Sequence, residues 1–268
     1  EAALIVEPYV TNSYLILGLK ISITTDLPSG YYAAVMFDTA SPIFAFNQIA
    51  ATINGASATG YGIYIKNSSS SYILGNYINI TGGTDLTGIY ISGSDSEKKL
   101  RSNTINVLAA SGNTSGITIL NNSNCEIRNN VIHGGLGNSS FGIVINTSSV
   151  GIYNNTINAG SASSISYGIH INEASPNIVN NIIFSRTATS YGIYEASSTS
   201  DPLSVENNNI FSVSTLYYDH SNTLKSDITD LYSTIENTTP GSLLFWNNLN
   251  YDLISSSNLY ENVSDPEG

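Results

Sequence analysis

Six segments between residues 62 and 210 repeat one pattern of side chains, and this repeat constrains the fold more than any other feature of the chain. Each repeat opens with a Gly-Ile pair and later reaches an Asn that has an aliphatic residue three positions before it and an Ile two positions after it. The opening glycines are Gly62, Gly88, Gly116, Gly142, Gly168 and Gly192, at steps of 24 to 28 residues. The asparagines are Asn76, Asn103, Asn130, Asn155, Asn181 and Asn208. A unit of this length is too small to bury its own core and must stack on its neighbours.

The spacing of the isoleucines within each repeat predicts strands. Alternating Ile positions indicate short strands with one buried face, and no window shows the period of a helix. Three short strands with their turns use about the length of one repeat, so each repeat is expected to form one coil of a parallel β-helix. Coils stack at a separation of about 4.8 Å, and equivalent side chains therefore form ladders along the solenoid.

The repeated asparagines are expected to form such a ladder at a tight turn. Asn tolerates the left-handed backbone conformation, and its amide can bond the Asn of the next coil. We predict that the side chains of Asn103, Asn130, Asn155 and Asn181 point into the turn. The preceding column, Asn129, Asn154 and Asn180, is predicted to point outward.

The segments GIYIKNSSSSYILGNYI (residues 62–78) and GIVINTSSVGIYNNTI (residues 142–157) carry a family resemblance. From about residue 31 to residue 211 the chain resembles the right-handed parallel β-helix superfamily, in particular Asn-rich repeat proteins related to pectate lyases and to the NosD-like repeats. The resemblance implies an all-β, right-handed parallel β-helix of about seven to eight coils with an irregular C-terminal cap. It is specific for fold and weak for activity, because many unrelated activities use this architecture.

The whole chain, residues 1–268, is predicted to be a single domain, with repeating coils at 14–211 and a capping segment with a linker-like tail at 212–268. Residues 34–49 fit an earlier, degenerate coil, and residues 15–21 fit one more pair of strands. In the cap, residues 226–235 are expected to form a short helix and residues 243–254 a closing coil. No comparable cap precedes Tyr14, which suggests a piece of a longer chain.

Charge and composition limit the classes of molecule that the protein is expected to bind. The formal net charge is −12, with 8 basic residues and charged residues making up 10% of the chain. Nucleic acids and anionic membranes require basic patches, so neither is an expected partner. The sequence has no apolar run long enough to insert into a membrane. A sparsely charged surface rich in hydroxyl and amide groups suggests a secreted or cell-surface protein. The single Cys125 excludes an intramolecular disulfide and is expected to be a buried structural thiol.

Acidic residues do not gather at one register. Hydrolysis of a glycosidic bond needs two carboxyl groups about 5 to 9.5 Å apart. The weak catalytic candidates are Glu173, Glu195 and Asp201, near His170. Glu195 takes an Ile position, so it either faces inward, with the raised pKa of a functional group, or lies where the strand ends and points to water. Because acids are not clustered and the histidines occupy unrelated registers, neither a metal nor another cofactor is expected.

One outward column has binding character. Tyr64 is expected to stack on Tyr90, and His170 to lie next to Tyr194, with further tyrosines just before the glycines. Flat rings on a flat face suit sugar rings, and Tyr adds a hydroxyl. The alternative is structural, because aromatic columns also stabilise sheets by stacking between coils or seat a covering loop or a sister subunit.

Three functions are consistent with these features. The first is a non-catalytic binding or adhesion protein, secreted or displayed on a surface, with a polysaccharide or cell-surface glycan as ligand. The second is a polysaccharide lyase or glycoside hydrolase that uses the acids near His170. The third is a structural subunit of an extracellular layer or filament, which self-associates.

Overall fold

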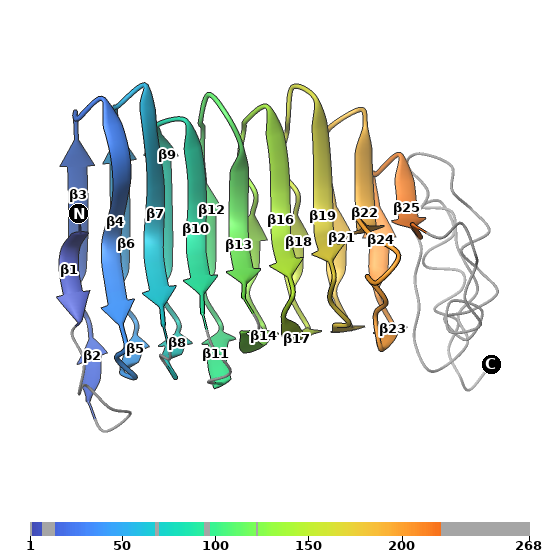
Figure 1. Cartoon of the computed structure of the whole chain (residues 1–268), viewed down its shortest axis with the longest axis horizontal. Coiled ribbons are helices and arrows are strands. Elements are labelled where there is room, and N and C mark those ends of the chain that lie inside the picture. The colour runs from blue at the N-terminus through green and yellow to red at the C-terminus, as the bar shows by residue number, and fades with distance from the viewer. Residues whose placement is uncertain (1, 7–13, 68–69, 94–96, 122, 221–268) are drawn as a thin grey trace, which may run out of the picture.

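The chain folds into a solenoid of about eight coils built from three parallel sheets. The structure, a computed structural model, describes residues 2–6, 14–67, 70–93, 97–121 and 123–220. The coils stack in order along the long axis, with the N-terminal coil at one end (Figure 1). Each complete coil contributes one strand to each sheet, as the three-strand interpretation of the repeat predicts.

Within the described residues, the strands of each sheet lie in the order of the coils. Sheet A contains β1 (Ala2–Val6), β4 (Ser29–Asp38), β7 (Ser57–Lys66), β10 (Asp85–Ser92), β13 (Thr114–Leu120), β16 (Ser139–Asn146), β19 (Ile165–Asn172), β22 (Ser190–Glu195) and β25 (Thr215–Tyr218). Sheet B contains β2 (Leu15–Leu17), β5 (Ile43–Ala45), β8 (Tyr72–Leu74), β11 (Glu97–Arg101), β14 (Asn124–Arg128), β17 (Ser149–Tyr153), β20 (Asn177–Val179) and β23 (Ser204–Glu206). Sheet C contains β3 (Lys20–Thr25), β6 (Gln48–Ile53), β9 (Tyr77–Gly82), β12 (Thr104–Val107), β15 (Val131–His133), β18 (Thr156–Asn158), β21 (Ile182–Phe184) and β24 (Asn209–Phe211).

Isoleucine ladders from the three sheets form the core. In sheet A, Ile63, Ile89, Ile117, Ile143, Ile169 and Ile193 pair strand to strand in one register. All six are fully buried. The stiff, branched side chain of Ile suits this stacking, because it keeps one rotamer and packs on its copy in the next coil. The predicted ladders are therefore confirmed.

The first position of each repeat must be glycine because there is no room for a Cβ atom. A Cβ atom on Gly116 would overlap the Cγ2 methyl of Ile132 in sheet C and would lie 2.7 Å from the carbonyl oxygen of Gly142. The other opening glycines meet the equivalent Ile of their own coil in the same way. Sheets A and C thus approach each other too closely at this position for any side chain.

The asparagine ladder is present and runs from Asn47 to Asn208. Asn130 donates from Nδ2 to Asn155 Oδ1 at 3.0 Å and to the carbonyl oxygen of Leu100 at 2.9 Å. Its own Oδ1 accepts from the backbone N–H and the Nδ2 of Asn103. These bonds recur in the neighbouring coils, and the inward asparagines are buried. The predicted inward column is confirmed.

The left-handed conformation belongs to the residue before the ladder, not to the ladder itself. The preceding position has φ between 53° and 64° at Phe46, Gly75, Ser102, Asn129, Asn154, Asn180 and Asn207. Asn129, Asn154 and Asn180 are exposed, as predicted. Two adjacent positions therefore have different roles in the turn. The first supplies the left-handed backbone bend, and the second supplies the buried side-chain amide.

The coils extend on both sides of the predicted range 14–211. β1 joins sheet A beside β4, and β25 joins it beside β22. The expected earlier coils are present as β2 to β6. The predicted helix at 226–235 and closing coil at 243–254 lie outside the described residues. Among the residues that are described, no helix is long and apolar enough to span a membrane.

Candidate functional site

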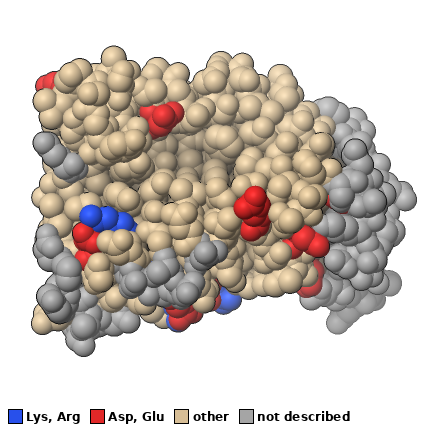
Figure 2. All heavy atoms as spheres, viewed as in Figure 1, with Lys and Arg blue, Asp and Glu red and all other residues tan. Residues whose placement is uncertain are grey.

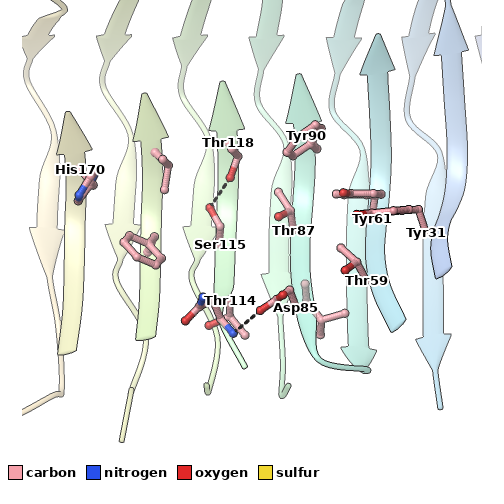
Figure 3. Close-up of a pocket in the computed structure, with 14 residues that line it drawn as sticks. Tyr31, Thr59, Tyr61, Asp85, Thr87, Tyr90, Thr114, Ser115, Thr118 and His170 are labelled. Carbon is pink, nitrogen blue, oxygen red and sulfur yellow. Dashed lines mark hydrogen bonds between the residues drawn. The ribbon is translucent and has the colours of Figure 1, made fainter. Parts of the chain in front are cut away.

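A groove of about 450 Å³ lies on the outer face of sheet A. It crosses the central coils, from β7 to β19, and Tyr31 of β4 lines its N-terminal side. Figure 2 shows this face hollowed near its centre, with an acidic group beside the hollow and most other charged side chains away from it. The close-up in Figure 3 shows the lining residues projecting from successive parallel strands.

The N-terminal wall of the groove is a cluster of three tyrosines. Tyr61 and Tyr90 lie with ring centroids 4.8 Å apart, and Tyr64 contacts both at 5.2 Å. Tyr64 and Tyr90 are paired in register on β7 and β10, whereas Tyr61 comes from the column just before the glycines. Tyr61 and Tyr90 line the groove, and Tyr64 supports them from behind.

The C-terminal wall is a second aromatic cluster. Phe141 and His170 line the groove, with centroids 5.6 Å apart and rings nearly perpendicular. Tyr167 stacks on Phe141 at 5.1 Å, and Tyr194 stacks on His170 at 5.3 Å. Each pair is held in register by the pairing of neighbouring strands, so the strand register sets the spacing of the rings in this wall.

The hollow between the walls exists because both outward columns carry small side chains in the middle coils. Thr87 and Ser115 replace rings in the column before the glycines, and Thr118 and Val144 replace them in the column two positions after the glycines. Thr118 donates its hydroxyl to Ser115 Oγ at 2.9 Å, and Ser115 donates to the carbonyl oxygen of Ile117 at 3.1 Å. The floor is thus a patch of hydroxyl and methyl groups.

The groove is nearly neutral. Burial raises the pKa of Tyr61 and, to a lesser extent, of Tyr90, so both hydroxyls remain protonated donors at neutral pH. Burial also lowers the pKa of His170, which favours the uncharged imidazole, and its buried Nδ1 makes no hydrogen bond to the described residues. Asp85, at the rim, is the one carboxyl group among the described residues that line the groove.

The four predicted ligand-binding residues fall into these two walls. Tyr90 and His170 line the groove, while Tyr64 and Tyr194 pack behind them. Sequence reasoning missed the roles of Phe141 and Asp85, and it did not recognise the small-residue gap. A signal for the gap was present in the sequence: rings give way to Thr87 and Ser115 in one column and to Thr118 and Val144 in the other, so the two gaps overlap in the coil of Ser115 and Thr118.

None of the predicted catalytic acids lines the groove. Glu173 is exposed in a turn with φ of 50°, and Asp201 is exposed near it, where its N–H donates to the carbonyl oxygen of Ala174. Glu195 faces the core, 1% exposed, and accepts a hydrogen bond of 2.5 Å from the Tyr217 hydroxyl. The alternative that Glu195 points to water is therefore wrong.

Among the described residues, neither Cys125 nor a cluster of metal-binding side chains lines the groove. Cys125 is buried beside the in-register Lys98, and burial raises the pKa of its thiol to about 12, as expected for an unreactive thiol. Within the described coils, no three or more His, Cys, Asp or Glu side chains converge in a group that could hold a metal ion.

Comparison with known families identifies the architecture. A family model described as the right-handed β-helix region matches residues 87–258, which is more than half of the chain. No match was found among curated proteins or among solved structures. Together with the parallel sheets and the coil register, the match shows that this chain belongs to the family of right-handed parallel β-helix proteins.

Proposed function

We propose that this protein is a non-catalytic binding or adhesion protein, secreted or displayed at a cell surface, that holds a carbohydrate chain in the groove of sheet A. The observation that carries the proposal is the groove itself, with aromatic walls and a hydroxyl-bearing floor. Aromatic faces pack against the apolar faces of sugar rings, and nearby hydroxyls exchange hydrogen bonds with sugar hydroxyls.

The dimensions of the groove favour an extended chain that runs along the solenoid axis. From β7 to β19 there are four strand-to-strand steps, on the order of 19 Å at about 4.8 Å per step. One such step is close to the length of a sugar residue in an extended polymer. Successive coils would then meet successive sugars, with Tyr61 and Tyr90 at one end and Phe141 and His170 at the other.

Binding is favoured over hydrolysis because the groove presents only Asp85 as a carboxyl group among the described residues. Both glycosidase geometries use a pair of carboxyl groups flanking the scissile bond. The lyase or hydrolase alternative and the structural-subunit alternative remain predictions. Their direct checks are activity on a panel of polysaccharides and light scattering of the full chain.

The proposal is tested by filling the groove without disturbing the fold. Thr118 lies in register between Tyr90 and Val144, so Thr118→Tyr adds a ring that the column already accommodates one coil away. A glycan array first identifies the bound sugar, and calorimetry then compares the variants. We expect wild type to bind and Thr118→Tyr to lose binding, because the new ring occupies the floor.

The chain offers a closely matched control. Thr104 in sheet C lies in register between Tyr77 and Val131, which repeats the surroundings of Thr118 on another face of the solenoid. Thr104→Tyr should bind the glycan as wild type does. Absence of any bound glycan, or equal binding by the Thr118→Tyr variant, would contradict the proposal.

A further inference from the structure

The carboxylate of Asp85 stands at the rim of the groove without a cationic partner among the described residues. Asp85 Oδ1 accepts a hydrogen bond of 2.7 Å from the backbone N–H of Asn113, a contact drawn in Figure 3. The ion pairs of the described residues join Lys66 to Asp38, Lys99 to Glu97, and Arg101 and Arg128 to Glu126. Asp85 takes part in none of them, although Asp38 on the same sheet does.

On the next strand to Asp85, a buried hydroxyl has no hydrogen-bond partner among the described residues. Thr114 is 1% exposed and lines the groove, and its Oγ1 has no hydrogen-bond partner among the described residues. Buried polar atoms in folded proteins are normally satisfied by protein, water or ligand. In the described part of the chain, a carboxylate without a counter-charge and a hydroxyl without a partner therefore lie along the same edge of the groove, where β10 and β13 begin (Figure 3).

The rest of the groove adds no positive charge. None of its described lining residues is Lys or Arg, and burial favours the neutral form of His170. A polymer of uronic acids would bring one carboxylate per sugar next to Asp85, in a protein whose net charge is −12. Like charges in a partly desolvated site repel one another, so such a ligand is disfavoured.

A sugar that carries a free amine would be attracted to Asp85 instead of repelled by it. An ammonium group can pair with the free side of the Asp85 carboxylate, and the rings of Tyr61 and Tyr90 elsewhere in the groove attract the ammonium groups of other sugars in the chain. Resting on the proposed glycan-binding function, we infer that the groove selects its ligand by charge: Asp85 favours sugars with a free amino group, accepts neutral sugars and rejects acidic ones.

The test compares three tetrasaccharides that differ in charge: a β-1,4-linked glucosamine tetramer, its fully N-acetylated form, and a galacturonic acid tetramer. Calorimetry at low salt measures each with wild type and with Asp85→Asn, which can still accept the hydrogen bond from Asn113. Asp38→Asn is the matched control, because it removes the same charge from sheet A outside the groove.

Wild type should bind the glucosamine tetramer more tightly than the acetylated tetramer, and the acid tetramer weakest of the three. A partly exposed ion pair contributes modestly, so Asp85→Asn should weaken amine binding by about two- to fivefold and leave the acetylated tetramer unchanged. Asp38→Asn should leave the affinities for the amine and acetylated tetramers as in wild type.

The outcomes separate this inference from the proposed function. If the acetylated tetramer binds but Asp85→Asn retains the full preference for the amine, or if the acid tetramer binds as tightly as the acetylated one, charge selection by Asp85 is wrong and glycan binding stands. If none of the three tetramers binds, the inference is overturned, and a glycan array without hits would then overturn the proposed function as well.

Discussion

At the scale of single residues, the inward asparagines satisfy the buried backbone of every turn. Each amide donates to the carbonyl of an earlier coil and to the next Asn, while its oxygen accepts from the previous one. A side chain with both a donor and an acceptor is needed for this, and Asn is short enough to reach both neighbours. Aliphatic side chains of similar size would leave the same groups unpaired.

Replacing one member of the ladder tests this account. Asn130→Ala should lower the free energy of unfolding by about 1–3 kcal/mol, because it removes the acceptor of the Asn103 backbone N–H and of the Asn103 side-chain amide, and a donor to the Leu100 carbonyl, in a buried turn. Chemical denaturation of both proteins measures the difference.

The preceding residue supplies the control. Asn129 is exposed with φ of 58°, so Asn129→Gly keeps the left-handed bend and should cost little. Asn129→Ala pays for the bend, roughly 1–2 kcal/mol, without losing a buried bond. If Asn129→Gly cost as much stability as Asn130→Ala, the assignment of the buried ladder amide to Asn130 rather than Asn129 would be wrong.

At the scale of elements, the opening glycines set how closely sheets A and C approach. The clash that a Cβ would meet involves a neighbouring backbone carbonyl as well as a methyl group, so a rotamer change alone cannot relieve it. Gly116→Ala should therefore destabilise the fold by roughly 1–3 kcal/mol, as overpacked cores do. Thermal or chemical unfolding gives the value.

A glycine on sheet B provides the comparison. A Cβ on Gly151 would meet the far end of the Tyr153 ring, which can rotate away. Gly151→Ala should therefore cost clearly less than Gly116→Ala. Equal costs would show that the loss of glycine itself, rather than the close approach of the two sheets, determines stability at these positions.

At the scale of the whole molecule, the described strands pair with strands of the adjacent coils. β13 pairs on both sides, with β10 and β16, whereas β1 pairs only with β4 among the described strands. Stability in such an array is close to a sum over coils and their interfaces, so it is distributed unevenly along the axis.

Hydrogen exchange followed by mass spectrometry measures that distribution. We expect the slowest exchange in the central strands of sheet A, from β10 to β19, and faster exchange in β1, since a coil with one neighbour opens at a lower cost. Uniform protection from β1 to β25 would instead mean that the solenoid opens as one cooperative unit.

The sequence by itself determined the coil, the inward ladders and the register, because these follow from residue type and period. Gly116, Ile117 and Asn130 recur at fixed spacing, and a strand places alternate residues on opposite faces. Only the tertiary structure decided that the two gaps in the outward columns join into one groove and which way Glu195 points. The groove forms where the small residues of two columns overlap, in the coil of Ser115 and Thr118. The inward turn of Glu195 accompanies a bond to Tyr217, 22 residues away on the next strand. Period predicts the direction of a side chain, whereas the space and partners around it come from neighbours that only the folded chain brings together.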